Sequence, residues 1–291
     1  MDTSPSRMDR REDALADSSA QLYLDLLKRC LLNLMYEDPA VRIPFGEPVS
    51  EAPLGVLVGF DRQKRLSGKD WPSQAHTMIG MRRLDNIQAL VEDIVRAQTP
   101  GDLIETGVWR GGATIFMRGL LKAYGITDRT VWVADSFAGF PNSDQEGASS
   151  RSYSSPELAP LRTGPPSEEV QTIIDHVMQG TSYEEVRDRF MRYGLLDEQV
   201  QFLRGWFRNT LPSAPIERFA LLRLDGDLHD STYDALQALY PKLSLGGYAI
   251  VDDYGTFVEC RQAVHDYFDA TNIKADIQPI DDEAVFWQKL G

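Results

Sequence analysis

Carboxylates follow two β-rich runs in the last third of the sequence. Asp225 ends the run FALLRLD, and Asp252 and Asp253 end the run GGYAIVDD. The amphipathic segment between the runs predicts a βαβ crossover, in which the two strands are parallel and close together. The three aspartates should then converge at the sheet edge where open α/β sheets bind ligands. Converging carboxylates repel one another unless a cation lies between them, and all-oxygen ligands favour Mg²⁺.

A glycine-rich turn, in the segment IETGVWRGG, predicts a second binding feature. Gly107, Gly111 and Gly112 would let the backbone approach a ligand and lead it to a helix N-terminus. The turn matches neither the GxGxxG nor the GxxxxGK phosphate-binding pattern. Glu105, just before it, would repel phosphate and suit an ammonium group. An ordinary tight turn of the fold is the alternative.

An acid also ends the next β-rich run, VWVADSF. Asp135 could there accept two hydrogen bonds from a ribose diol, or it could simply cap a helix. Together with Glu105 and the glycines, it favours a nucleoside ligand without phosphate. S-adenosylmethionine fits that description better than NAD does.

The elements that position these residues alternate between strand and helix patterns. A helix is expected at about 78–97, before Pro100 and Gly101. Strands are expected in DLIETG, TVWVADSF, QVQFLRG, FALLRLD and GGYAIVDD, with two late ones near DIQPID and AVFWQKL. The alternation indicates an α/β sheet.

Three regions are expected along the chain. Residues 1–18 are polar and aperiodic, which predicts a disordered N-terminus. Residues 19–99 are expected to form a helical N-terminal arm and cap, and 100–291 the main domain. An insertion at about 138–167, rich in Gly, Ser and Pro, predicts a lid or binding loop, with functionless disorder as the alternative.

The first helix of the arm carries a long apolar stripe. The residues at helical spacing are Leu22, Leu26, Leu27, Cys30, Leu31, Leu34 and Met35. Such a stripe packs either on the chain's own core or on a partner subunit. Both interpretations stay open at this point.

Composition excludes several classes of protein. The chain has 291 residues and 42% hydrophobic content, and no apolar run approaches the ~20 residues of a membrane span. The N-terminus lacks the apolar core of a signal peptide, so a cytoplasmic protein is expected. A net charge of −14 argues against nucleic acid or an anionic membrane as partner. Two cysteines are too few for a disulfide framework.

Five ordered segments of the sequence resemble one known family. They are IETGVWRGGATIFMRG, VWVADSFAGFP, FLRGWFRNTLP, LRLDGDLHDSTYDAL and GGYAIVDDYG. They are similar to the macrocin O-methyltransferase family, which methylates sugars of macrolide and aminocoumarin antibiotics. The resemblance covers about 20–291 and looks closest to the noviose 4-O-methyltransferases of aminocoumarin pathways.

This resemblance implies a fold, two cofactors and an assembly. The fold is the class I S-adenosylmethionine-dependent methyltransferase fold, which is Rossmann-like. Its seven-stranded sheet is mostly parallel with an antiparallel strand. S-adenosylmethionine is implied as donor and Mg²⁺ as cofactor. The family also implies homodimers in which the N-terminal arm contributes to the neighbouring subunit.

The resemblance also assigns roles to residues. Asp225, Asp252 and Asp253 match the metal ligands, and Asp227 matches the proposed general base. Thr77 and Met78 match a segment near the methionine end of the donor, and Gly205 and Trp206 lie where such folds hold adenine. The expected donor-binding residues are Thr77, Met78, Glu105, Gly107, Trp109, Gly111, Gly112, Asp135, Ser136, Gly205, Trp206 and Asp225.

The chemistry of methyl transfer explains why such groups are needed. A sugar hydroxyl is a poor nucleophile at neutral pH, and a metal lowers the pKa of an oxygen that it binds. A base is still needed beside the metal. Asp227 is the first candidate and His229 the second, and the alternative for both is a solvated loop residue. The candidate apolar walls, each of which could equally be core, are Trp109, Trp206, Phe207 and Tyr254.

The sequence therefore predicts a Mg²⁺-dependent O-methyltransferase that acts on a sugar hydroxyl of a glycosylated natural product in antibiotic biosynthesis. Two alternatives stay open. One is a methyltransferase of another acceptor with vicinal oxygens, such as a catechol. The other is a non-catalytic, nucleoside-binding dimer module.

Overall fold

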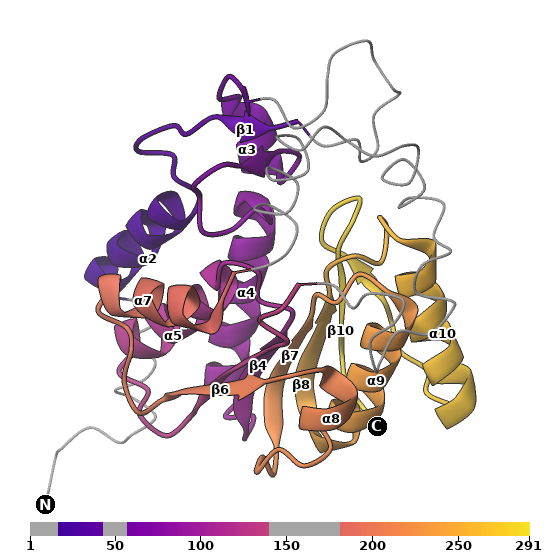
Figure 1. The fold of residues 1–291 in the computed structure, drawn as a ribbon. Helices are drawn as coiled ribbons and strands as arrows, with labels where there is room; N and C mark the ends of the chain where they lie inside the picture. The colour runs from indigo at the N-terminus through magenta and orange to yellow at the C-terminus, as the bar shows by residue number, and fades with distance from the viewer. Residues whose placement is uncertain (1–16, 43–56, 140–180) are drawn as a thin grey trace, which may run out of the picture.

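A seven-stranded sheet forms the centre of the protein (Figure 1). The computed structural model describes residues 17–42, 57–139 and 181–291. In spatial order the strands are β6 (Val200–Arg204), β5 (Val131–Asp135), β4 (Asp102–Thr106), β7 (Phe219–Leu224), β8 (Leu243–Val251), β10 (Val285–Gln288) and β9 (Gln278–Pro279).

The first five of these strands pair in parallel, whereas β10 is antiparallel to both β8 and β9. The expected mostly parallel sheet with an antiparallel strand is thereby confirmed. The neighbours β7 and β8 are parallel, as the crossover pattern predicted.

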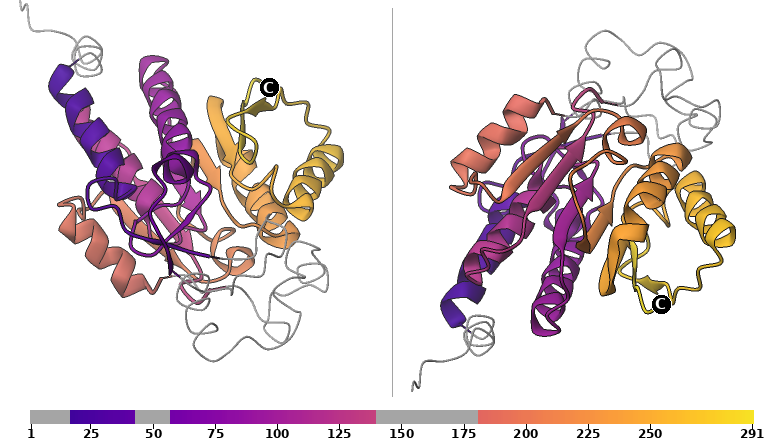
Figure 2. Two further views of the ribbon diagram at one scale, coloured as in Figure 1. Left: turned by 90° about the horizontal axis from the view of Figure 1, so that it is seen from above. Right: turned by 90° about the horizontal axis from the view of Figure 1, so that it is seen from below.

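Helices cover both faces of the sheet, as the views from above and below in Figure 2 show. The face that we call the α4 face is covered by α2 (Ser18–Leu31), α4 (Gly80–Arg96), α5 (Gly112–Ala123) and α7 (Tyr183–Arg192). The opposite face, the α9 face, is covered by α8 (Phe207–Thr210), α9 (His229–Leu239), the 3₁₀ turn Tyr240–Lys242 and α10 (Val258–Thr271).

Because successive side chains of a strand point to opposite faces, the sheet has a separate core on each face. Leu103 and Leu221 point into the core of the α4 face, and Ile104 and Leu222 point into the core of the α9 face. The strands are apolar on both sides because both faces are covered. A charged side chain inside these strands is therefore buried and needs a partner.

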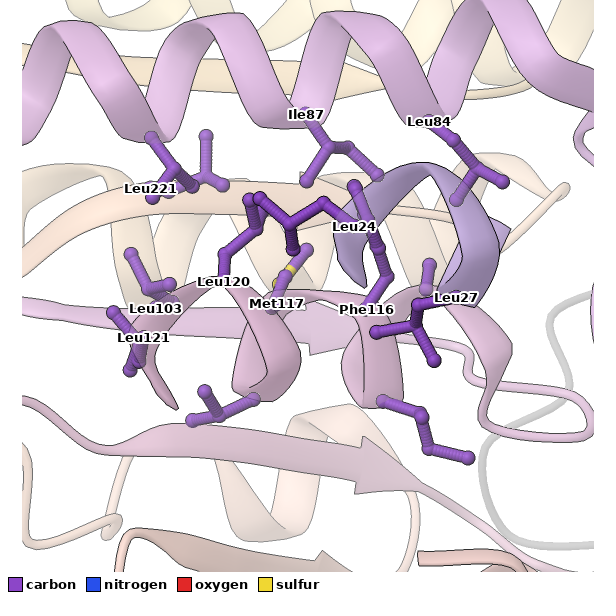
Figure 3. Close-up of a cluster of buried hydrophobic side chains, with 14 of the residues drawn as sticks. Leu24, Leu27, Leu84, Ile87, Leu103, Phe116, Met117, Leu120, Leu121 and Leu221 are labelled. Atoms are coloured by element: carbon purple, nitrogen blue, oxygen red, sulfur yellow. The ribbon is translucent and has the colours of Figure 1, made fainter. Parts of the chain in front are cut away.

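The apolar stripe of α2 is buried in one part and exposed in another. Leu24 and Leu27 pack beside Phe116 of α5 in the core of the α4 face (Figure 3). By contrast, Leu22 and Leu26 are 72% and 51% exposed. One side of this helix thus packs on the chain's own sheet while the other carries apolar side chains at the surface.

The part of the arm between α2 and α4 contains structure that the sequence did not predict. A small sheet of β1 (Ala40–Val41), β2 (Leu57–Val58) and β3 (Trp71–Pro72) lies beside α3 (Arg62–Ser67). The guanidinium of Arg65 is fully buried and bonds Asp38 at 2.7 Å and Asp70 at 2.9 Å. Strands of two residues have no readable period, and the buried ion pairs of Arg65 add to the apolar packing of Ala40 and Val41 in this region.

Two of the expected regions lie largely outside the described residues. These are the N-terminal segment 1–18, of which 17–18 are described, and the insertion at 138–167, of which 138–139 are described. In the described part of the chain, no helix combines the length and the apolar character that crossing a membrane requires.

Candidate active site

The parallel hydrogen-bond pattern continues one residue past the ends of the strands and fixes the backbone of the site. Four bonds of 2.9 Å run from N–H to carbonyl: Gly205 to Asp135, Gly107 to Ala134, Asp225 to Thr106 and Asp252 to Leu224. The segments expected to bind the donor and the metal therefore meet at one edge of the sheet, as strand order requires.

Close packing of the backbone makes glycine necessary at position 107. Gly107 has φ +82°, and a Cβ there would lie 1.7 Å from the carbonyl oxygen of Asp225. The turn after β4 can therefore press against the end of β7 only without a side chain. This contact brings the glycine-rich turn next to the carboxylates.

Three aspartates lie together beyond β7 and β8, and we call them the aspartate cluster: Asp225, Asp227 and Asp253. Each offers a carboxylate oxygen, and the three oxygens lie within 4.8 Å of one another. Asp227 has φ +59°, and its N–H donates to Oδ2 of Asp253 at 3.1 Å. The left-handed turn thereby folds Asp227 back over the strand ends.

Burial and mutual repulsion act against ionisation of the aspartate cluster. Burial, with repulsion from neighbouring carboxylates, raises the pKa of Asp225 to about 6 and that of Asp227 to about 8. The pKa of Asp253 is likewise raised by burial and by its acidic neighbours. A cation among the three would relieve this cost, and a set of carboxylate oxygens fits Mg²⁺.

The aspartate cluster differs from the expected metal-ligand set at one position. Asp252 is not part of it, because both of its carboxylate oxygens bond arginines. Oδ1 accepts from Arg223, and Oδ2 accepts from Nη1 of Arg83 at 2.7 Å. Asp252 lies on the α4 face, where Arg83 of α4 reaches it, and the structure groups Asp227 in its place with Asp225 and Asp253.

Arg223 is a site residue that sequence reasoning missed. Its side chain is fully buried in β7. Nη1 donates to Oε1 of Glu105 and to Oδ2 of Asp225, and Nη2 donates to Asp252. The signal was a single charge inside the apolar run FALLRL, two residues before Asp225 and hence on the same side of the strand. Such a residue requires buried carboxylate partners.

Glu105 presents an oxygen that no protein group satisfies. Its side chain is buried, Oε1 pairs with Arg223, and Oε2 has no hydrogen-bond partner among the residues described. Burial raises the pKa of this carboxyl to about 8. A ligand that donates a hydrogen bond, such as an ammonium or a hydroxyl group, would satisfy the oxygen.

Asp135 holds the backbone of the glycine-rich turn. Oδ2 accepts from the N–H of Val108 at 2.8 Å, and Oδ1 accepts from the N–H of Phe137 at 2.7 Å. The hydroxyl of Ser136 donates to the carbonyl of Gly139 at 2.9 Å. Asp135 does not cap α5, whose N-cap is Gly111 with no side-chain cap. The expected ribose contact stays a prediction, because Oδ1 is also approached by the Ser136 hydroxyl at 3.5 Å while Oδ2 has a second lone pair.

The segment with Thr77 and Met78 lies against the N-terminus of α5. A Cβ on Gly112 would lie 2.3 Å from the carbonyl oxygen of His76 and 2.7 Å from Cβ of Thr77. Gly111, with φ +84°, is the N-cap of α5. The structure thus brings the arm to the glycine-rich turn, where the donor was expected.

Arg110 ties this arm segment to the turn. Its Nη1 donates to the carbonyls of Pro72 at 3.0 Å and Ala75 at 2.9 Å, and its guanidinium lies 4.1 Å from the ring centroid of Trp109. His76 next to it bonds Tyr193 through Nδ1 at 3.0 Å. Burial, followed by the charges of Arg189 and Arg110, lowers the pKa of His76 to about 4, so its ring is neutral at pH 7.

His229 is engaged by carboxylates on both ring nitrogens. Nε2 lies 2.9 Å from Asp266 of α10, and Nδ1 lies 3.3 Å from Asp230. The ring stacks on Tyr233 with centroids 5.9 Å apart. The structure therefore places Asp227 in the aspartate cluster and His229 against α10.

The residues expected near adenine and in the apolar walls lie around the same edge. Gly205, with φ +132°, directly follows β6, and Trp206 is the N-cap of α8. The ring of Phe207 lies close to the end of β7: a Cβ placed on Gly226, two residues after that strand, would be 3.4 Å from it. Tyr254 bonds His265 of α10 at 2.7 Å.

Comparisons with known proteins agree with this arrangement. The model of the family described as Macrocin-O-methyltransferase (TylF) matches residues 20–289. Demethyldecarbamoylnovobiocin O-methyltransferase of Streptomyces niveus is 46% identical over 273 residues, which are 94% of this chain and 95% of that protein. Mycinamicin III 3''-O-methyltransferase of Micromonospora griseorubida is 47% identical over 272 residues, 94% of this chain and 98% of that protein.

A solved structure shows the same fold. The structure of the O-methyltransferase NovP superposes with a TM-score of 0.77 at 44% identity. The match covers 94% of this chain and 100% of that one. It includes the central sheet and the helices that position the site.

Proposed function

Because the chain belongs to the macrocin O-methyltransferase family, we propose that it methylates a sugar hydroxyl of a glycosylated natural product in antibiotic biosynthesis, with S-adenosylmethionine as donor and Mg²⁺ as cofactor. The relatives named above are O-methyltransferases of demethyldecarbamoylnovobiocin and of mycinamicin III. A third relative, 46% identical, is named as the 4'-O-methyltransferase of a rhamnosyl-tetracenomycin, which supports a sugar-bearing acceptor. The observation that carries the proposal is the aspartate cluster, which Arg223 links to Glu105 and its unsatisfied oxygen.

Each part of the site has a role in this reaction. Asp225 and Asp253 would hold Mg²⁺, which when bound lowers the pKa of the acceptor hydroxyl. Asp227, whose oxygen lies in the same cluster, would accept the hydroxyl proton as the sugar oxygen attacks the donor methyl. The bond from that methyl to sulfur breaks, and S-adenosylhomocysteine leaves. The fixed backbone matters because the rate depends on holding the two reacting atoms ~3–3.5 Å apart.

Donor binding is assigned to the glycine-rich turn and its neighbours. Oε2 of Glu105 would accept from the ammonium group of S-adenosylmethionine, and Thr77 would line its methionine end. Asp135 would accept from the ribose hydroxyls. Gly205 and Trp206, at the end of β6, would flank the adenine.

The test combines an acceptor panel with removal of the metal. The protein is incubated with S-adenosylmethionine and glycosylated macrolides, aminocoumarins or simple catechols, and products are identified by mass spectrometry. We expect a mass gain of one methyl group on the sugar of at least one glycoside. EDTA should abolish turnover, and excess Mg²⁺ should restore it, because the carboxylates then regain their cation.

Two results would contradict this proposal. Equal turnover with and without EDTA would remove the metal from the mechanism. Methylation of catechols alone would assign a different acceptor class to the same site.

We also propose that the protein is a homodimer in which the arm forms the interface. Leu22 and Leu26 are one turn apart on α2 and exposed, and Tyr36, beyond the C-terminal end of α2, is 88% exposed. Large exposed apolar side chains on one segment are typical of a protein–protein contact. Light scattering after gel filtration should give twice the chain mass of 32.7 kDa.

A glutamate introduced at the surface tests whether the arm, and not another exposed apolar site, forms the interface. Leu26→Glu should yield a monomer, whereas Leu290→Glu, at a residue that is 77% exposed near the C-terminus, should leave the dimer intact. A wild-type protein that elutes as a monomer at micromolar concentration would refute the assignment.

A further inference from the structure

We propose that Arg223 is a positioning residue that couples the donor site to the cation site, an inference that rests on the proposed function. No ligand is expected to contact Arg223 itself. Its guanidinium instead bonds one carboxylate of each site. When a ligand binds one of these carboxylates, the hydrogen bond between the guanidinium and the other carboxylate should change in strength.

The register of the sheet places Arg223 between the two sites. It lies directly opposite Glu105 in the parallel β4–β7 pair. It also precedes Asp225 by two residues on the same side of β7. Nη1 donates both to Oε1 of Glu105 and to Oδ2 of Asp225, the latter at 2.5 Å. The nitrogen Nη1 thus bonds a carboxylate of the donor site and a carboxylate of the cation site at the same time.

The other end of the guanidinium is anchored. Nη2 bonds Asp252, whose second oxygen accepts from Arg83 of α4 at 2.7 Å. Arg83 in turn bonds Asp281 at 2.8 Å and also Glu283. Because Arg223 is fully buried, it has no water to exchange with, and its position follows from these partners alone.

Sharing one nitrogen between two carboxylates determines the sign of the coupling. A cation at Asp225 draws charge away from the carboxylate that competes with Glu105 for Nη1. The bond from Arg223 to Glu105 then strengthens and holds Glu105 in place for the donor. Conversely, a donor that binds Glu105 orders the guanidinium and thereby Asp225. Each ligand should therefore tighten the other by the same factor.

Calorimetric titration of the wild-type protein measures this coupling directly. Mg²⁺ is titrated with and without saturating S-adenosylhomocysteine, which keeps the ammonium group for Glu105 but lacks the sulfonium charge and so removes the repulsion between sulfonium and cation. We expect Mg²⁺ to bind about fivefold more tightly, or more, in the presence of S-adenosylhomocysteine. The reverse titration should give the same factor.

Two variants assign the coupling to Arg223. In Arg223→Lys a single ammonium nitrogen replaces the two guanidinium nitrogens that reach Glu105 and Asp225 on one side and Asp252 on the other. Both ligands should still bind, but the coupling factor should fall to about one. Arg118→Lys is the matched control, because Arg118 is also buried and pairs with Asp197 through two nitrogens, outside the site. Its coupling should equal that of the wild type.

The outcomes separate this inference from the proposed function. Independent binding of the two ligands to the wild type, or full coupling in Arg223→Lys, would overturn it. If Arg223→Lys does not fold, Glu105→Gln removes the competing charge instead and should also abolish the coupling, and full coupling in that variant would overturn the inference. A wild-type protein that binds neither ligand would overturn the proposed function itself.

Discussion

Asp227→Asn is expected to lower kcat by about 10²- to 10⁴-fold, the usual contribution of a general base. Asparagine keeps the size of the side chain and keeps the N–H that donates to Asp253, but its amide cannot take up the hydroxyl proton. Donor affinity should stay within a few fold of the wild type. Steady-state kinetics with an accepted glycoside measure the loss.

The Mg²⁺ affinity of this variant distinguishes a base from a ligand. Asp227→Asn should bind Mg²⁺ nearly as well as the wild type in calorimetry. Asp225→Asn, which removes a proposed ligand from the same aspartate cluster, should lose both affinity and turnover. If Asp227→Asn instead loses Mg²⁺ binding to the same degree as Asp225→Asn, then Asp227 is a ligand and the base must be sought elsewhere.

Gly107→Ala is expected to destabilise the fold by about 4 kcal/mol or more, which places it among the largest effects of single substitutions. The added Cβ would lie 1.7 Å from the carbonyl oxygen of Asp225, so either the turn or the end of β7 must move. Both carry residues of the site, and the folded fraction should therefore lose donor binding as well. Urea unfolding measures the stability, and calorimetry measures the binding.

Gly125 offers a matched control for the backbone conformation. It too has a positive φ, +61°, but nothing lies within 4 Å of a Cβ placed there. Gly125→Ala should therefore cost only the left-handed strain of about 1–2 kcal/mol. Equal urea midpoints for the two variants would show that the contact with Asp225 is not what makes glycine necessary at 107.

The family and the sheet could be predicted from the sequence because their signals are local and strong. The runs FALLRLD and GGYAIVDD are each long enough to identify a buried strand, and the helical segment between them predicts their parallel pairing. The parallel pairing of β7 and β8 confirms the predicted sheet, and the match to the family model confirms the family. The meeting of Asp225 with Asp253 follows from the same topology.

The partners of individual side chains could not be predicted in this way. Asp252 bonds Arg83, which is 169 positions away in the sequence, and no local pattern indicates that pair. The place of Asp227 in the aspartate cluster depends on its left-handed backbone, which is uncommon for a residue other than glycine. The division of the α2 stripe depends on how α2 lies against α5, which the periodicity of a single helix does not encode.

The backbone bonds that continue past the strand ends have a consequence for how such an enzyme can diversify. Main-chain atoms alone make them, so a side chain on this rim can be exchanged without breaking them, provided that it does not itself hold a loop as Asp135 does. Substitutions of such side chains can then change which acceptor fits at this rim while the strand ends keep their places.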